Sequence, residues 1–116
     1  MFKKTITALA AFAITGCASI QIPADRLERS EASVRAAEEM GASAVPAARL
    51  HLQMAKDQTE AAKRMAGNGD ERAVLVLARA EADAELALGM AREVTTHNDA
   101  ERASEDLKAV KARTLP

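Results

Sequence analysis

The sequence predicts an all-α protein: a three-helix antiparallel bundle, running up-down-up, with a long third helix extending toward the C-terminus. Alanine accounts for 28 of the 116 residues, and together with Glu, Arg, Lys and Leu it gives the composition of closely packed helices. Beyond residue 24, apolar residues recur every three or four positions, as on one face of a helix. Two short breaks, at 41–46 and 67–70, divide this stretch into three helices, and such short connections make neighbouring helices antiparallel.

The first helix is predicted over 24–40, after Pro23, a residue that can open a helix. Its buried stripe is expected at positions three or four residues apart, which are Leu27, Ser30, Val34, Ala37 and Gly41. Gly41 suits the left-handed conformation that ends many helices, and Pro46 suits the first position of the next helix.

The second helix is predicted over 46–66. Its apolar face is expected at Ala47, Leu50, Met54, Ala61 and Met65, with Asp57 and Gln58 interrupting it. The turn "GNGD" follows at 67–70. In this turn Gly67 is predicted to take the left-handed conformation, and Asp70 is predicted to cap the N-terminus of the third helix.

The third helix carries the most regular pattern. Residues at alternating spacings of four and three form a heptad seam: Ala73, Leu77, Ala80, Ala84, Ala87, Ala91 and Val94. A seam made mostly of alanine is typical of a coiled coil whose neighbouring helix packs close.

Continued past Val94, the same spacing meets Asn98 and Glu101, and a new stripe begins out of register at Ala100, Ala103, Leu107 and Val110. Three interpretations of "TTHND" (95–99) are therefore open, namely a hinge, a short break or a bend where the helix leaves the bundle. We favour a helix that continues through it with a changed face. On this prediction a helical bundle over 24–96 precedes a helical C-terminal extension over 97–116. The last residues, "RTLP", are expected to fray.

The N-terminal sequence predicts a secretory signal peptide over residues 1–16. "MFKK" is basic, and the apolar run from Thr5 to Thr15 is about half of the roughly 20 residues that span a bilayer. The alternative is a buried helix near the N-terminus. A buried helix would show polar residues every third or fourth position, and this run has almost none.

Ile14-Thr15-Gly16-Cys17 resembles the lipobox of bacterial lipoproteins. The resemblance implies a thioether-linked diacylglycerol on Cys17, cleavage between Gly16 and Cys17, and acylation of the new amino group, so that 17–23 is a lipidated anchor and tether. Stable anchoring in a membrane needs more than one acyl chain, and the three acyl chains of such a lipoprotein meet this requirement. In such lipoproteins an Asp directly after the cysteine retains the protein in the inner membrane, and this chain has Ala18 at that position. The resemblance therefore implies a location at the outer membrane, facing the periplasm. With the only cysteine used as the anchor, no cysteine-based chemistry is expected.

Composition argues against several functions. Without residues 1–16 the chain has no Phe, Tyr or Trp, and its 14 basic residues (16 less Lys3 and Lys4) against 17 acidic ones leave a net charge of −3. No nucleic-acid partner is expected, because such surfaces use aromatic faces and basic patches. His51 and His97 are expected at boundary or surface positions, and neither has a histidine at i+3 or i+4 for zinc. We expect no catalytic, metal or cofactor site and no enzyme activity.

Gly41 to Glu93 resembles an alanine-rich domain of unknown function found in bacterial lipoproteins. The shared pattern is Gly-Ala before a Pro-Ala start, alanines spaced through two helices, a Gly-Asp turn and a "DAELA" segment. In that family the domain often precedes a peptidoglycan-binding domain resembling the outer-membrane protein OmpA, and no such domain is expected here. Murein lipoprotein is similar in its lipobox and alanine heptads, but it is one uninterrupted helix ending in a wall-linked lysine. This chain is interrupted and ends in Leu115-Pro116, so no covalent attachment to peptidoglycan is expected.

These observations predict a lipid-anchored envelope lipoprotein that acts as a non-catalytic helical scaffold or adaptor in the periplasm. Its partner is expected to be another envelope protein or a second copy of the chain, bound through the bundle or the stripe from Ala100 to Val110. Two alternatives remain open at this point: a chaperone-like module that binds lipid or peptide between its helices, and a regulator of an envelope enzyme.

Overall fold

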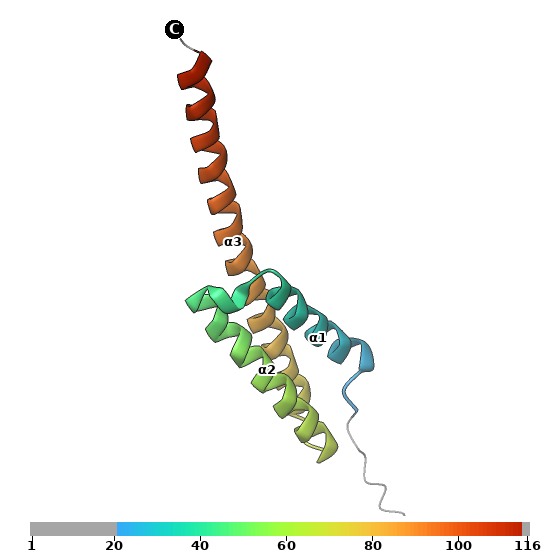
Figure 1. Cartoon of the computed structure of the whole chain (residues 1–116). Helices are drawn as coiled ribbons and strands as arrows, with labels where there is room; N and C mark the ends of the chain where they lie inside the picture. Colours follow the sequence, from blue (N-terminus) through green and yellow to red (C-terminus); the bar gives the residue numbers. More distant parts are fainter. Residues whose placement is uncertain (1–20, 115–116) are drawn as a thin grey trace, which may run out of the picture.

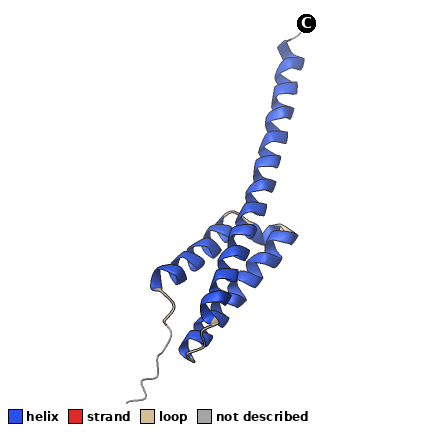
Figure 2. Cartoon of the chain, turned by 180° about the vertical axis from the view of Figure 1, so that it is seen from behind, coloured by secondary structure: helices blue, strands red, loops and turns tan. Residues whose placement is uncertain are grey.

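The computed structural model describes residues 21–114. The predicted signal peptide and the residues Gly16, Cys17 and Ala18 therefore lie outside the described part of the chain. The elements are α1 (Ala24–Glu39), the 3₁₀ turn η1 (Ala42–Ala44), α2 (Pro46–Gly67) and α3 (Ala73–Thr114). The three α-helices run up, down and up (Figure 1), and α3 packs against both of the others. Figure 2 shows the same arrangement from behind, with α3 continuing far beyond the bundle. The predicted fold class is confirmed.

The connection between α1 and α2 follows the prediction. Gly41 has φ 84°, in the left-handed region, and its N–H donates to the carbonyl of Glu38 at 2.9 Å. Glycine adopts this conformation without the steric cost that a side chain adds. Pro46 is the first residue of α2.

The end of α2 corrects the prediction for Gly67, which is still helical. Gly69, with φ 74°, takes the left-handed conformation instead. The N–H of Gly69 donates to the carbonyl of Ala66 at 3.0 Å, and that of Asp70 donates to the carbonyl of Met65 at 2.9 Å. These two bonds are the Schellman pattern, which requires the left-handed residue at Gly69 because the helix continues through Gly67.

Asp70 lies three residues before Ala73, where α3 begins, and accepts hydrogen bonds in the turn that leads into the helix. Its carboxylate Oδ1 accepts the backbone N–H of Arg72 at 3.0 Å, and its carbonyl accepts the N–H of Ala73, the first helical residue. The Arg72 guanidinium also donates to this carboxylate, at 2.7 Å for Oδ2. These hydrogen bonds hold the pKa of Asp70 below its usual value, because they favour the ionised carboxyl.

The predicted stripes of α1 and α3 face the core. Ser30 and Ala37 are buried on α1, and Leu27, Val34 and Gly41 are half-buried. On α3 six of the seven predicted seam residues are buried: Ala73, Leu77, Ala80, Ala84, Ala87 and Ala91. Val94 is the exception, with 39% of its surface exposed. The seam is buried only where α1 and α2 lie beside α3, and Ala91 is its last covered position.

The predicted apolar face of α2 is wrong. Ala47, Leu50 and Met54 are exposed, and Ala61 and Met65 are only half-buried. The buried residues follow spacings of four and three along a neighbouring stripe: Ala48, Leu52, Ala55, Thr59 and Ala62. Because the α3 seam is mostly alanine, its partner helix approaches closely and meets it with small side chains.

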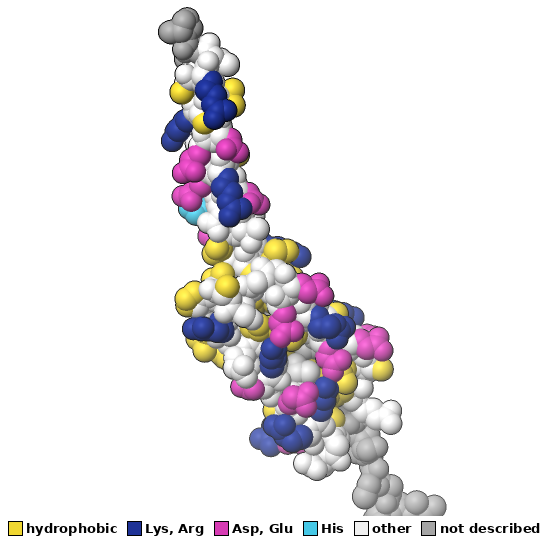
Figure 3. All heavy atoms as spheres, viewed as in Figure 1, with side chains coloured by type: hydrophobic (Ala, Val, Ile, Leu, Met, Phe, Trp, Pro, Cys, Tyr) yellow, Lys and Arg dark blue, Asp and Glu magenta, His cyan; other side chains and the backbone are white. Residues whose placement is uncertain are grey.

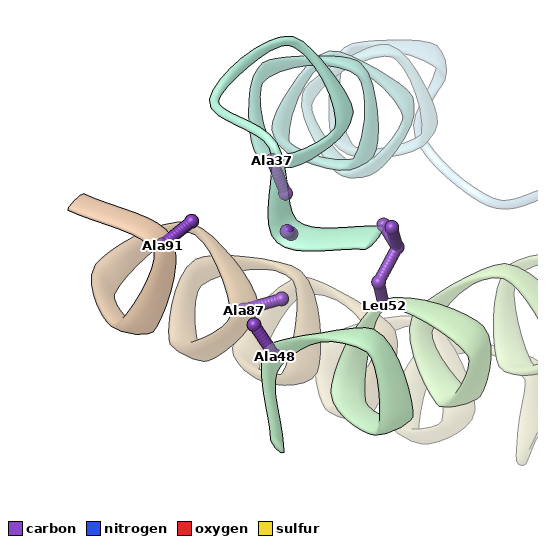
Figure 4. Packing of buried hydrophobic residues seen from close by; sticks show 6 residues of the cluster. Ala37, Ala48, Leu52, Ala87 and Ala91 are labelled. Atoms are coloured by element: carbon purple, nitrogen blue, oxygen red, sulfur yellow. The ribbon is translucent and has the colours of Figure 1, made fainter. Parts of the chain in front are cut away.

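The core is therefore built mainly from alanine. Leu77 and Ser30 are the largest fully buried side chains in the described residues. Ala48 of α2 and Ala87 of α3 point toward one another where the helices meet, with Ala37 of α1 above them (Figure 4).

A polar pair lies within this alanine core, between α1 and α2. The hydroxyl oxygens of Ser30 and Thr59 are 3.0 Å apart, and Thr59 donates to the carbonyl of Ala55 at 2.8 Å. Since the Thr59 proton is used for Ala55, Ser30 donates to Thr59. Both buried hydroxyls thereby have partners, as buried polar groups require.

α3 has no break at 95–99, so the predicted continuous helix is confirmed. Arg113 and Thr114 are also helical, so the helix extends further than the expected fraying suggested, and Leu115 and Pro116 lie outside the described residues. Every residue from Arg92 to Thr114 is exposed.

Candidate partner-binding surface

The exposed part of α3, residues 92–114, is called the C-terminal arm here. It is about 34 Å long at 1.5 Å per residue. Most helices in proteins are stabilised by packing rather than by propensity, and residues 92–114 are all exposed. The continuity of the arm with the buried part of α3 supports it, because the costly nucleation step has already been made inside the bundle.

Local pairs add to the stability of the arm. The side chains of His97 and Glu101 approach to 3.3 Å, and Arg102 and Asp99 approach to 3.6 Å. Lys111 and Arg113 lie in the last turn, where positive charge interacts favourably with the helix dipole. Each exposed pair of this kind contributes only about 0.2–0.5 kcal/mol, and the apolar side chains of the arm stay uncovered.

The predicted stripe of Ala100, Ala103, Leu107 and Val110, called the arm stripe, lies entirely on the surface of the arm. Leu107 is 56% exposed and Val110 is 54% exposed. Because each residue turns the helix by about 100°, the arm stripe lies about 140° around the axis from the seam that contacts α1 and α2. The arm stripe therefore faces away from the bundle and is open to a partner.

Charge is divided along the arm. Its middle section carries Asp99, Glu101, Glu105 and Asp106, with Arg102 among them, and its end carries Lys108, Lys111 and Arg113. Figure 3 shows acidic side chains nearer the bundle and basic ones toward the tip. A partner that lies along the arm therefore meets opposite charges at its two ends.

A second apolar surface, which no local sequence pattern indicates, lies where the arm leaves the bundle. A groove of about 570 Å³ is lined by Val45 and Ala47, next to the start of α2, and by Met90, Glu93, Val94 and His97 of α3. Exposed Leu50 and Met54 of α2 lie on the same outer face of that helix as Ala47. Hydrophobic side chains gather on this side of the molecule (Figure 3).

Polar contacts occupy the flanks of the bundle. His51 Nδ1 lies 2.8 Å from Asp83 Oδ1, and Gln58 Nε2 donates to Asp83 Oδ2 at 2.9 Å, so α2 is tied to α3. Arg26 of α1 donates to Glu81 of α3 at 3.3 Å. His51 lies at the boundary, as predicted, but its partner is 32 positions away in the sequence and no local pattern indicates it.

Lys63 of α2 forms a further link to α1. Its ammonium lies 2.7 Å from a Glu31 oxygen and 2.8 Å from a Glu60 oxygen. Hydrogen bonds to Glu31 and Glu60 raise the pKa of Lys63, and the bond from Lys63 lowers the pKa of Glu60. These groups edge a groove of about 350 Å³ between α1 and α2, and each is already engaged by its neighbours.

Two structural features are absent from the part of the chain that the structure describes. Among residues 21–114, no three His, Cys, Asp or Glu side chains are grouped so that they could hold a metal ion. No helix in the same range combines the length and the apolar composition needed to cross a membrane. The described residues also present two exposed apolar surfaces, the arm stripe and the groove at the root of the arm.

Comparison of the chain with models of protein families, with curated proteins and with solved structures gave no match. The resemblance of Gly41 to Glu93 to an alanine-rich lipoprotein domain stays a prediction. The surfaces described above therefore carry the functional argument, and the arm stripe is the longest of them.

Proposed function

We propose that the protein is a lipid-anchored envelope lipoprotein that acts as a non-catalytic helical scaffold or adaptor in the periplasm, most simply at the outer membrane. The observation that carries this proposal is the C-terminal arm. It is a continuous helix in which every residue is exposed, and it presents an apolar stripe that faces away from the bundle.

The arrangement of the ends suits a scaffold. α1 begins at one end of the bundle and the arm leaves from the other (Figure 1). Only six residues, 18–23, separate Cys17 from Ala24, the first residue of α1, so a lipid on Cys17 holds the start of the bundle within about 24 Å of the membrane surface. α3, about 63 Å long at 1.5 Å per residue, then carries the arm stripe away from the anchor.

The chemistry of the arm stripe indicates its kind of partner. Covering a side chain such as leucine or valine fully contributes about 1.5–3 kcal/mol, and the stripe presents both at helical spacing. A second helix or an apolar groove matches such a stripe, which is how amphipathic helices are recognised. The small residues Ala100 and Ala103 allow a neighbouring backbone to approach closely at that end of the stripe.

The anchor is tested by Cys17→Ser in the full chain. We expect loss of lipid labelling, together with an uncleaved precursor or a protein that no longer fractionates with membranes, because serine offers no thiol for the thioether. Metabolic labelling with a radioactive fatty acid and membrane fractionation measure both. A variant that still matures at residue 17 and stays with the outer membrane would contradict the proposed anchor.

The arm is tested by the double variant Leu107→Lys with Val110→Lys. We expect crosslinks to the partner in intact cells to fall at least tenfold, while the melting temperature measured by circular dichroism changes little, because neither side chain contacts the bundle. The matched control is Ala109→Lys with Ala112→Lys, which adds the same charge on the opposite face of the arm and should keep the crosslinks.

Two results would overturn the role of the arm. If the stripe variant and the control variant crosslink equally well, the arm stripe binds no partner. If the stripe variant unfolds the domain, Leu107 and Val110 stabilise the bundle rather than a complex.

A further inference from the structure

We infer that the partner of the arm is a second copy of the same chain, and that two C-terminal arms pair antiparallel over residues 96–114. In this pairing Ala103 of one copy faces Leu107 of the other, and Ala100 faces Val110. The inference rests on the proposed function, because it names the partner of the arm stripe described there.

The spacing of the arm supports helix pairing. The arm stripe extends to Thr96 and Thr114 with alternating intervals of four and three residues, which is the heptad pattern of a coiled coil. All these positions are exposed, so the seam is free along its whole length. In the proposed register, residue i of one copy lies level with residue 210 − i of the other.

Side-chain size favours the antiparallel direction. The stripe has two small residues nearer the bundle, Ala100 and Ala103, and two larger ones nearer the tip, Leu107 and Val110. Antiparallel pairing gives each of these layers one small and one large side chain, so the helices keep a constant separation. Parallel pairing would place alanine on alanine and leucine on leucine, which require different separations within the range of about 8–10 Å.

Charge complementarity favours the same register. One row of residues that flanks the arm stripe consists of Asp99, Asp106 and Arg113. In an antiparallel pair this row faces the same row of the other copy, so Asp99 of each copy lies next to Arg113 of the other. On this flank Asp106 meets its own copy at the symmetry axis, so one like-charge contact stands against the two Asp99–Arg113 pairs. Pairing shifted by one heptad toward the bundle would instead place Asp99 against Asp106 and Arg92 against Arg113. Such like-charge contacts disfavour that register.

Parallel pairing has one favourable contact, Asp106 with Lys111, and two costly ones. If the arm stripe is continued back toward the bundle at the same intervals, it includes Glu93 and Arg79. In a parallel pair each of these two residues would face its own copy. Like charges inside a helix seam are repulsive and lose their water. The antiparallel overlap of 96–114 leaves both residues outside the contact.

The bundles do not obstruct this pairing. The arm stripe points about 140° away from the seam that holds α1 and α2, so each bundle lies on the far side of its own arm. The paired arms are about 28 Å long at 1.5 Å per residue, with one bundle at each end. The dimer is therefore a rod with its two anchor segments far apart.

Single cysteines in a Cys17→Ser background of the full chain test the direction of pairing. We expect Ser104→Cys to form a disulfide-linked dimer under mild oxidation, because residue 104 meets its own copy beside the antiparallel axis. Ala100→Cys alone should remain at least tenfold less crosslinked. An equimolar mixture of Ala100→Cys and Val110→Cys should give a mixed dimer, and adding Leu107→Lys with Val110→Lys should abolish the Ser104→Cys crosslink.

Two outcomes would overturn the antiparallel dimer without overturning the proposed adaptor function. Self-crosslinking of Ala100→Cys without crosslinking of Ser104→Cys means that the arms pair parallel. No crosslink with any variant, together with a monomer mass in analytical ultracentrifugation, means that the arm does not bind its own copy. If the double lysine variant then still loses crosslinks in cells, the adaptor function stands with a different partner.

Discussion

Replacing Leu77 with Ala is expected to lower the free energy of unfolding by about 2–5 kcal/mol, the range observed for removing a buried leucine from a core. Leu77 is fully buried and is, with Ser30, the largest such side chain in the described residues. An alanine core has little bulk to move into the space, so the cavity stays open. The melting temperature should fall by at least about 8 °C for a domain of this size, measured by circular dichroism.

Leu75→Ala is the matched control. Leu75 lies two residues earlier in the same helix and is 65% exposed, so its truncation should change the free energy of unfolding by no more than about 0.5 kcal/mol. Equal losses for the two variants would mean that the buried face of α3 has been assigned incorrectly.

Replacing Ala84 with Leu is expected to cost about 1–3 kcal/mol, through overpacking rather than through a cavity. Ala84 is fully buried in the α3 seam, and the buried face of α2 consists of three alanines with Leu52 and Thr59. A leucine at this position has no space unless the helices separate. Separation would weaken the contacts of every neighbouring layer, so denaturant unfolding should show a lower midpoint.

Ala82→Leu is the corresponding control, because Ala82 is exposed on the opposite face of α3. Leucine and alanine are both strong helix formers, so this variant should unfold almost as the parent does. If Ala82→Leu destabilises as much as Ala84→Leu, exposure on α3 does not distinguish the two faces, and the packing described above is wrong.

The third helix shows how much the sequence could predict. The α3 seam has one dominant stripe, because its buried residues all face neighbours on the same side and repeat without interruption. The interval pattern therefore indicated the buried positions as far as Ala91. It failed at Val94 because an apolar side chain in register looks the same in sequence whether or not a neighbouring helix reaches it.

The second helix shows why a pattern alone can be ambiguous. α2 carries two adjacent apolar stripes, and the larger side chains, Leu50 and Met54, favoured the wrong one. The smaller stripe, which includes Ala48 and Ala55, is buried because α3 presents alanine and approaches closely. Which of the two stripes of α2 is buried thus depends on the side chains that α3 presents. These side chains lie outside any local window of the α2 sequence.

Some features of the candidate surface could likewise be predicted from the sequence, and others depend on how the helices pack. The three helices, the seam of α3 and the out-of-register stripe of Ala100, Ala103, Leu107 and Val110 are predictable from sequence, because helix periodicity and turn residues are local properties. The packing of the helices is needed to show that Leu107 and Val110 are uncovered, that the root of the arm carries an apolar groove, and that His51 meets Asp83. Exposure and long-range contact depend on where the other helices end, so they follow from packing and not from any one segment.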